Sequence, residues 1–351
     1  MTPLEGMSAV QLEAWAAARG ASAGAARTLA RFLVARAAGR EAPLPSRALL
    51  DASAREFSQT PLRADAVRDP DGTVRFAVQL ADGNVIETVL IHQGAGSGGS
   101  GTRAKERWTV CVSSQVGCAR GCTFCETGRL GLLRNLSAAE IVGQYALAAR
   151  AAMEQGAEAP RNLVFMGMGE PLDNLEEVLQ AVAVLREPIG FAVPERRITV
   201  STVGIVPRMD ELYARGGATN VAVSLHALEP AARRSLLPVA RKWPLEDLRA
   251  AIARAPRAVL LQWTLIEGVN DADADADALV EFARGLEVRV NLIPLNPGPI
   301  AAQRAPPLER CRAFQKRLNN AGVRALLRLP HGQSVGGACG QLAGARRMGP
   351  A

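Results

Sequence analysis

Residues 108–136, WTVCVSSQVGCARGCTFCETGRLGLLRNL, contain four of the six cysteines of this chain. Three of them, Cys118, Cys122 and Cys125, follow the spacing C-x3-C-x2-C. Three thiolates on one loop can ligate three irons of a [4Fe–4S] cluster. The fourth iron then stays open to a small molecule, whereas a cluster held by four cysteines suits electron transfer. The stretch therefore predicts a cluster that can bind a further ligand.

A zinc site and a disulfide framework are the two alternatives for these cysteines. Zinc could use the same three with Cys111 or a histidine as fourth ligand, because structural zinc is four-coordinate. It more often takes paired C-x2-C groups. Six cysteines in 351 residues are too few for a secreted fold held by disulfides. The iron–sulfur cluster is therefore the favoured prediction.

The length and composition allow one large domain and a smaller one. No apolar run reaches the ~18 residues of a membrane span, and the first 15 residues do not have the pattern of a secretory signal. A reducing cytoplasm suits both an oxygen-sensitive cluster and free thiols. We therefore expect a cytoplasmic protein without a membrane partner.

The formal net charge of +7 comes mostly from arginine, since the only lysines are Lys105, Lys242 and Lys316. Arginine binds phosphate through two N–H groups and stacks on bases. Alanine and arginine are abundant together throughout the chain, so composition bias explains part of this charge. The charge modestly favours a nucleic-acid partner.

Residues 1 to about 72 are predicted to form a small helical domain, and residues 73–351 the core. Ser8 and Gln11 fit a capping box at the start of the first helix. Such a basic helical unit could hold RNA or simply pack on the core. The pattern then changes to period two on either side of Asp82-Gly83, which predicts a β-hairpin. Glu87 lies in its second strand, where a solvent-facing carboxylate is the commoner case.

Beyond Trp108, strand-like and helix-like segments alternate. Strands are predicted at residues 108–112, 162–167, 197–202, 220–226, 259–266, 288–295 and 323–329, with helices between most of them. This alternation favours a parallel sheet with crossover helices. We expect an α/β fold, a partial TIM-like (β/α)6 barrel with the small helical domain at its N-terminus. The glycine-rich residues 94–101 precede a strand rather than a helix, so we interpret them as a loop and not a nucleotide site.

Polar residues follow several predicted strands. They are Gly169, Glu170, Ser201, Ser224, His226 and Asn296, and the cysteine loop follows the first strand in the same way. Barrels of βα units place their sites at this carboxyl edge. Each residue alone could instead make a turn, a helix cap or a structural hydrogen bond. Together they predict a site at one end of the barrel.

Cys339 lies among glycine and alanine in the sequence GGACGQLAG, after the last predicted strand. Small neighbours allow an accessible thiol, which a covalent role requires. Cys311, in contrast, belongs to an amphipathic helical pattern and is predicted to be a buried, inert cysteine.

Four stretches together are similar to one family. CVSSQVGCARGCTFC, MGMGEPLDN, VSLHA with NLIPLNP, and ACGQLAG resemble the RlmN/Cfr family of radical S-adenosylmethionine (SAM) RNA adenine methyltransferases. The resemblance covers nearly all of the chain from about Val85 onward. It implies a [4Fe–4S] cluster on Cys118, Cys122 and Cys125. It also implies that SAM binds at Gly169, Glu170, Ser201, Ser224, Leu225, His226 and Asn296.

The resemblance also implies a catalytic sequence. Cys339 would take a methyl group from one SAM, and a second SAM, cleaved at the cluster, would provide the radical that activates this group. The carbon would then add to an adenine ring carbon, and Cys111 would release the product by forming a transient disulfide with Cys339. Glu87 matches the proton acceptor of the family. The expected partners are ribosomal RNA, possibly transfer RNA, and an electron donor such as flavodoxin or ferredoxin, with the protein as a monomer.

Two stretches differ from the usual pattern of the family. Pro330 to Ser334 (PHGQS) replaces an Arg-Gly-Asp-Asp-like run, and Glu126-Thr127-Gly128 is closer to the Cfr type. We expect methylation at C2 of adenosine, and these differences keep C8 methylation as the alternative. A radical SAM enzyme acting on a peptide or small molecule, with Cys339 as hydrogen donor, is a further alternative. A non-enzymatic iron–sulfur RNA-binding protein would leave Cys111 and Cys339 unexplained.

Overall fold

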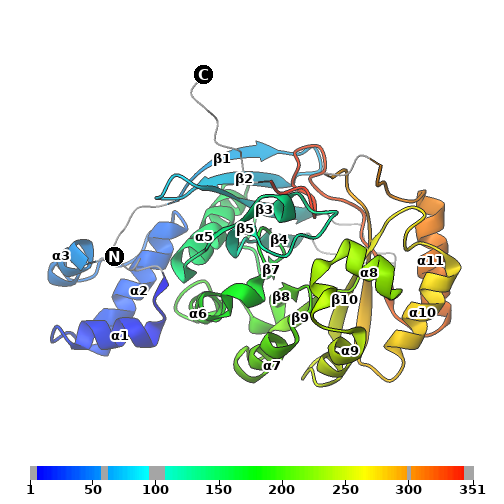
Figure 1. Cartoon of the computed structure of the whole chain (residues 1–351). Coiled ribbons are helices and arrows are strands. Elements are labelled where there is room, and N and C mark those ends of the chain that lie inside the picture. Colours follow the sequence, from blue (N-terminus) through cyan, green and yellow to red (C-terminus); the bar gives the residue numbers. More distant parts are fainter. Residues whose placement is uncertain (1–5, 57–61, 95–106, 299–301, 344–351) are drawn as a thin grey trace.

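The computed structural model describes residues 6–56, 62–94, 107–298 and 302–343. One ten-stranded sheet organises these residues, in the order β1-β2-β3-β4-β7-β8-β9-β10-β11-β12. Figure 1 shows helices α6, α7, α9 and α10 around the outside of this sheet, with the N-terminal helices at one end. Most of the glycine-rich segment predicted as a loop lies outside the described residues.

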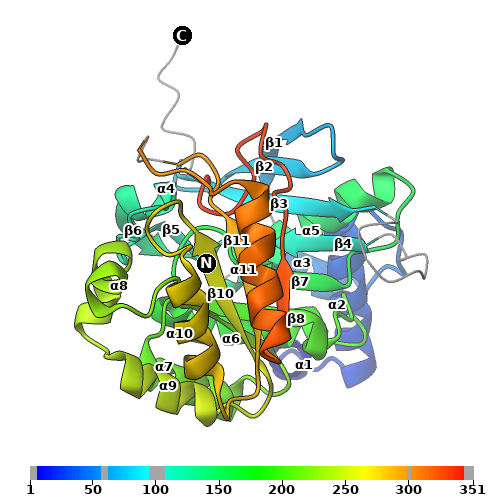
Figure 2. The ribbon, with the colours of Figure 1, turned by 90° about the vertical axis from the view of Figure 1, so that its right-hand side faces the viewer.

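The parallel part of the sheet forms the barrel wall. Its strands are β4 (Arg107–Cys111), β7 (Asn162–Phe165), β8 (Ile198–Thr202), β9 (Asn220–Ser224), β10 (Val259–Leu265), β11 (Val288–Pro294) and β12 (Ala325–Leu327). Each pairs in parallel with the next. The crossovers between them contain α5 (Ala138–Glu154), α6 (Leu175–Arg186), α7 (Val206–Arg215), α8 (Pro230–Leu236) with α9 (Leu245–Ala253), α10 (Asp273–Ala283) and α11 (Leu308–Asn320). These βα units confirm the predicted partial barrel, and Figure 2 shows α10 and α11 over its last strands.

Helices α7 and α8 are not among the predicted elements. Helix α7 buries only Met209 and Leu212, and α8 has only seven residues. Both helices are short and contain a proline in their first turn, which in a sequence is also a signal for a turn. The strands are easier to predict because they are buried and rich in Val, Ile and Leu.

Three antiparallel strands extend the sheet beyond β4: β1 (Arg63–Arg68), β2 (Val74–Gln79) and β3 (Val85–Gln93). The predicted hairpin is confirmed, with Gly83 at φ 81° in the turn between β2 and β3. Strand β1 lies inside the range predicted as helical, so that prediction was wrong for residues 63–68. Five of its six residues are exposed at the sheet edge, and a polar edge strand has no apolar alternation to reveal it.

The N-terminal helices are α1 (Ala9–Ala17), α2 (Ala23–Ala37) and α3 (Arg47–Glu56). The predicted capping box is confirmed, since the Ser8 hydroxyl accepts from the Gln11 N–H and the Gln11 side chain accepts from the Ser8 N–H. Leu12, Leu29 and Leu33 form a small apolar cluster apart from the barrel core. A domain boundary near residue 72 stays a prediction.

A second, two-stranded sheet carries the cysteine loop. It consists of β5 (Gln115–Cys118) and β6 (Gly131–Asn135), and the short helix α4 (Glu126–Arg129) lies between them. At Gly117 a Cβ would lie 1.8 Å from the Gly131 carbonyl oxygen, so the two strands approach too closely for any side chain there. This hairpin was not predicted from the sequence, because its strands are short and residues 115–135 contain four glycines.

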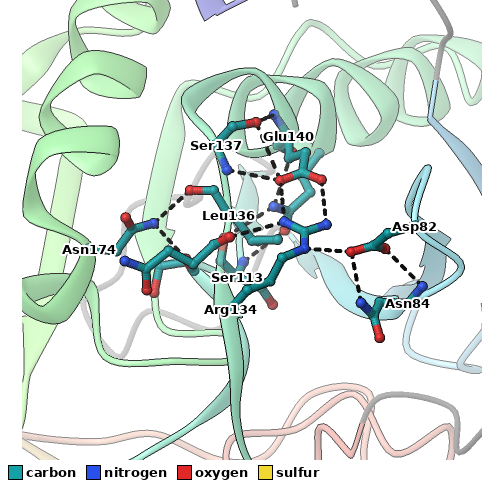
Figure 3. A network of polar contacts seen from close by, with 11 residues as sticks. Asp82, Asn84, Ser113, Arg134, Leu136, Ser137, Glu140 and Asn174 are labelled. Carbon is teal, nitrogen blue, oxygen red and sulfur yellow. Dashed lines mark hydrogen bonds and ion pairs between the residues drawn. The ribbon is translucent and has the colours of Figure 1, made fainter. Parts of the chain in front are cut away.

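Arg134 attaches this hairpin to the rest of the fold (Figure 3). Its guanidinium donates to both carboxylate oxygens of Glu140 at 2.8 and 2.9 Å and to Asp82 at 2.6 Å. Glu140 also completes the second predicted capping box, with Ser137 at the start of α5, which is confirmed. On the other side of the hairpin, Asn174 donates to the carbonyls of Leu136 and Ser114 at 2.7 and 2.8 Å. These contacts join β6 to the β2–β3 turn, α5 and α6.

Gln144 is the buried polar centre between α5 and the sheet. Its Oε1 accepts from the Ser113 N–H at 2.8 Å and from the Thr88 hydroxyl at 2.7 Å, and its Nε2 donates to the Ser113 carbonyl at 3.1 Å. The Ser113 hydroxyl in turn donates to the Glu87 carbonyl, and it accepts from the Met168 N–H. One side chain therefore fixes the backbone next to Glu87 and next to Met168.

Replacing Gln144 by Leu should destabilise the protein by about 2–4 kcal/mol, because at least two buried polar groups lose their partners. Chemical denaturation measures this change in the free energy of unfolding. Gln79→Leu, at an exposed position of β2, is the matched control and should change it by less than about 1 kcal/mol. Equal stability of the two variants would contradict the importance of this network.

Candidate functional site

The carboxyl ends of the parallel strands surround a cavity of about 140 Å³. Its lining includes nearly all the residues singled out from the sequence at these ends: Cys118, Cys122, Cys125, Gly169, Glu170, Ser201, Ser224, His226, Asn296 and Cys339. The residues come from the cysteine loop, four different strand ends and the C-terminal segment. The fold therefore brings them together from positions more than 200 residues apart in the chain.

The three cysteines of the loop face this cavity. Burial raises the pKa of Cys118 to about 12, with smaller contributions from the charges of Glu170 and Cys125. Burial, followed by the charges of Cys125 and Cys118, raises the pKa of Cys122. The thiols are thus close enough to oppose one another's ionisation. Phe124, which lies between Cys122 and Cys125 in the sequence, packs edge-on against the His226 ring, with the two ring centroids 4.8 Å apart.

Gly169 and Glu170 line the cavity after β7. Gly169 has φ 102°, and a Cβ there would lie 2.8 Å from the Gln115 backbone nitrogen, so this position requires glycine. Glu170 is buried, and burial raises its pKa to about 7. Its carboxylate accepts from the backbone N–H groups of Leu172 and Val203 at 3.0 and 2.8 Å. These bonds hold a carboxyl group at the cavity wall, where it can pair with a cationic group.

His226 follows β9 in a left-handed backbone conformation, at φ 57°. Burial, with the nearby charge of Arg233, lowers its pKa to about 3, so the ring is neutral near pH 7. Its Nδ1 accepts from the Thr264 N–H at 2.9 Å, and Nε2 therefore carries the proton. Leu225 is fully buried and does not line the cavity. Ser201, near the carboxyl end of β8, donates to the Phe165 carbonyl at 2.6 Å.

Cys339 reaches the same cavity from the C-terminal segment. The Asn296 amide donates to the Cys339 carbonyl at 2.9 Å. The Thr127 hydroxyl donates to the Leu342 carbonyl, and the Glu126 N–H donates to the Gly340 carbonyl at 2.8 Å. As a whole residue, Cys339 is exposed. Protein atoms nevertheless surround its thiol, and this burial raises the pKa of the thiol. The segment is thus docked against the loop that bears the three cysteines.

A second cavity, of about 680 Å³, adjoins the first and shares several lining residues with it. Cys111, at the end of β4, lines this cavity and not the smaller one, whereas Cys339 lines both. Burial raises the pKa of Cys111, and the charge of Cys339 adds to this effect. The two thiols therefore interact, and Cys339 stands between the two cavities. Cys311 is buried in α11, as predicted.

Glu87 is buried in β3 and does not face solvent, contrary to the commoner case for a strand carboxylate. It pairs with Arg75 and accepts from the Ala343 N–H at 2.9 Å. Glu87 lines neither cavity. Its contacts nevertheless place it next to the segment that carries Cys339.

Known proteins resemble this geometry and sequence closely. The Radical SAM superfamily pattern matches residues 112–280. A Sorangium cellulosum protein named "Probable RNA methyltransferase" is 45% identical over 347 residues, covering 94% of this chain and 84% of that protein. The "Dual-specificity RNA methyltransferase RlmN" of Syntrophobacter fumaroxidans is 45% identical, covering 78% of this chain and 77% of its own length. The chain belongs to the RlmN/Cfr family of radical SAM RNA methyltransferases.

A solved structure agrees with this assignment. The crystal structure of a radical SAM methyltransferase from Sphaerobacter thermophilus superposes with a TM-score of 0.88 and 39% identity, covering 98% of this chain and all of that one. The RlmN/Cfr protein described here is thus a SAM-dependent radical RNA methyltransferase. No helix among its described residues is both long and apolar enough to cross a membrane.

Radical SAM enzymes use a [4Fe–4S] cluster and SAM, and the residues present fit both groups. Three thiols from one loop border a common cavity, and burial raises the pKa of two of them, Cys118 and Cys122, so thiolates at these positions need a compensating positive charge. Iron provides that positive charge. The buried carboxyl of Glu170 and the neutral Nε2–H of His226 offer an acceptor and a donor to the amino-acid and nucleoside parts of SAM.

Sequence reasoning missed the residues that hold the C-terminal segment from the other side. The β1–β2 turn provides Asp69 and Asp71. Asp69 Oδ2 accepts from the Ser334 N–H at 3.1 Å and from its hydroxyl at 2.6 Å, and Asp71 Oδ2 accepts from the Gly332 N–H at 3.0 Å. The sequence Asp69-Pro-Asp-Gly72 is a recognisable turn, but nothing in it indicates a partner 265 residues later.

Replacing Asp69 by Ala should loosen the segment that carries Cys339. Two hydrogen bonds to Ser334 are lost, so local opening should become easier by about 1–2 kcal/mol and the open fraction should rise roughly 5–30-fold. The rate of alkylation of Cys339 by iodoacetamide, and hydrogen exchange over residues 331–343, measure this opening. Asp65→Ala, on the exposed face of β1, is the control. Unchanged rates in Asp69→Ala would show that the contact does not hold the segment.

Proposed function

We propose that this enzyme methylates C2 of an adenosine in ribosomal RNA, with transfer RNA as a second candidate substrate and with Cys339 as the carbon carrier. The position of Cys339 between two cavities carries this proposal. The smaller cavity contains the three cluster cysteines, and the larger one contains Cys111. A carbon on Cys339 can therefore be activated on one side and delivered on the other.

Adenine C2 needs such a carrier because it is electron-poor and does not attack the SAM methyl group directly. The Cys339 thiolate displaces the methyl from a first SAM, forming an S–CH3 bond. A [4Fe–4S] cluster held by Cys118, Cys122 and Cys125 would, together with a second SAM, supply the radical chemistry that removes one hydrogen atom from this group. The remaining S–CH2 radical carbon adds to the ring. The adduct then gives up one electron, which offsets the one that the external donor supplied, and stays attached to Cys339.

Release of the product requires a second sulfur and a base. Cys111 attacks the sulfur of Cys339, so the carbon–sulfur bond breaks and a disulfide forms. Glu87 is the proposed acceptor of the proton that leaves the ring carbon. The transferred CH2 carbon takes up a second proton and becomes the methyl group. The two electrons lost by the thiols balance the reductive cleavage of the second SAM. An external dithiol must then reduce the disulfide before the next turnover.

Removing Cys118 tests the iron–sulfur assignment. Cys118→Ala, reconstituted with iron and sulfide without oxygen, should lose the brown absorbance at roughly 400 nm that is typical of such clusters. It should also lose most of its bound iron, because one of the three thiolate ligands is absent. Cys311→Ala is the control, since that thiol is buried in α11 away from the cavity. A normal spectrum for Cys118→Ala would refute ligation by this residue.

Two measurements test the carrier role of Cys339. After exposure to SAM, Cys339 should gain the mass of one CH2 group, about 14 Da, in the peptide mass spectrum. Cys111→Ala should trap a covalent protein–RNA adduct, because the second sulfur is missing. An unmodified Cys339 in active enzyme would favour the hydrogen-donor alternative. Freely released methylated RNA from Cys111→Ala would remove the proposed role of that cysteine.

Nucleoside mass spectrometry of RNA from a deletion strain distinguishes C2 from C8 methylation. Glu126-Thr127-Gly128, which is closer to the Cfr type, is the feature that favours C8. A monomeric state, a flavodoxin or ferredoxin electron donor and a cytoplasmic location stay predictions. Membership of the family supports the monomeric state and the electron donor. The need to protect a cluster and free thiols from oxygen supports the cytoplasmic location.

A further inference from the structure

The larger cavity has a strongly basic outer end. Six arginines line it: Arg107, Arg196, Arg197, Arg257, Arg289 and Arg328, which we call the arginine mouth. Five of them lie within or just before the first residues of a parallel strand, namely β4, β8, β10 and β11. The arginine mouth is therefore at the amino-terminal edge of the barrel, opposite the edge that bears the three cluster cysteines.

The path from the arginine mouth to the thiols follows the inward-facing side of the strands. Along β4, Arg107, Thr109 and Cys111 all line the cavity, and along β11 so do Arg289, Asn291 and Ile293. Successive inward residues are two apart, as a strand requires. At 3.3 Å per residue, the Cα atoms of Arg107 and Cys111 are roughly 13 Å apart. One cavity thus connects the basic edge with both catalytic-cysteine candidates.

The charge of the arginine mouth is not neutralised within the described part of the chain. No Asp or Glu is among the residues that line the cavity. None of the six arginines forms an ion pair with another described residue, whereas arginines on the outer helices, such as Arg215 and Arg254, are paired. Neutral amides orient two of the six. Arg328 Nε donates to Asn291 at 2.9 Å and Arg197 Nη1 donates to Asn162 at 3.3 Å.

Like charges are also held close together here. Although part of Arg328 is exposed, burial of its guanidinium and the nearby charge of Arg107 lower its pKa. Unpaired guanidinium groups that repel one another gain stability from a bound anion, and phosphate suits their bidentate geometry. Leu326 and Leu329, which are 38% and 55% exposed, add apolar surface beside them. This combination suits a nucleotide chain better than a simple inorganic anion.

We propose that the arginine mouth binds the phosphates of the RNA strand on both sides of the target nucleotide. This inference rests on the proposed function, because it uses RNA as the substrate and Cys111 and Cys339 as the reacting thiols. The target nucleotide leaves its stack and enters the larger cavity from the amino-terminal edge of the barrel. SAM occupies the smaller cavity at the opposite edge, so the substrate and the cofactor reach Cys339 from different sides.

The volumes and linings support this separation. The larger cavity, of about 680 Å³, lies within the 300–1,000 Å³ typical of small-molecule sites and can therefore hold a nucleotide. The residues shared by both cavities, Met166, Gln262, Ile293, Asn296 and Cys339, form the partition between them. Cys111 lies on the RNA side of this partition, where the adduct would be resolved.

Charge removal at the arginine mouth tests the inference. The variant Arg107→Gln/Arg257→Gln/Arg289→Gln loses three charges from the mouth. The control Arg47→Gln/Arg312→Gln/Lys316→Gln loses three exposed charges from α3 and α11. The probe is a stem–loop RNA with a single adenosine in its loop, and its dissociation constant is measured by fluorescence anisotropy at several salt concentrations.

The mouth variant should bind the RNA roughly tenfold or more weakly than the control. Each phosphate contact on a single strand contributes about 0.7 to the slope of log affinity against log salt, so three lost contacts should lower this slope by about 2. Methylation of Cys339 by SAM in the absence of RNA should stay at the wild-type rate in both variants, which shows that the SAM side is intact and the fold is preserved.

Hydrogen exchange on the wild-type protein gives a second measurement that needs no substitution. Bound RNA should protect residues 257–260 and 286–290 at the amino-terminal strand edge. Equal binding and equal salt slopes for the two variants, in an enzyme that methylates RNA, would overturn the inference and leave the proposed function standing. Protection confined to the opposite strand edge would do the same. Failure of the wild-type protein to bind or methylate RNA would overturn both.

Discussion

The docking of the C-terminal segment against the barrel is the interaction on which the site depends. Cys339 is 214 residues beyond the last cluster cysteine, and no sheet pairing fixes its position. Hydrogen bonds from Asn296, Thr127 and Glu126 hold it on the inner side, and Asp69 and Asp71 hold the preceding residues on the outer side. Each such bond contributes only about 1 kcal/mol, so their number rather than any single bond fixes the thiol.

The consequence of this docking is a division of the barrel interior. Ordinary βα barrels fill their interior with layers of side chains. Here the inward residues of β4, β8 and β11 include small or polar side chains such as Thr109, Thr199 and Asn291, and a large cavity stays open. Cys339 lies at the partition, so the proposed arrangement places SAM on one side of it and the acceptor base on the other. Catalysis of this kind depends on placing reactive groups rather than on acid–base strength.

Much of the fold could be predicted from the sequence because the parallel strands are buried on both faces and read as continuous apolar runs. The cysteine spacing and the polar residues after each strand located the smaller cavity for the same reason, since parallel strands deliver their ends to one edge. Strand β1 and the β5–β6 hairpin could not be predicted, because one is a polar edge and the other depends on glycine contacts across the chain. Burial of Glu87 and the contact between Asp69 and Ser334 depend on tertiary packing. No local pattern encodes such long-range pairs.

The contacts of Glu126 and Thr127 join two parts of the site that the sequence keeps far apart. Both residues belong to the loop between Cys125 and β6, and both bind the backbone of the segment that carries Cys339. Ligands that order this loop must therefore favour the docked segment, and by thermodynamic reciprocity a docked segment must tighten the hold of the loop on its ligands. With the cluster on this loop, as proposed above, metal loading and the docking of the segment that carries Cys339 would be linked equilibria rather than separate steps.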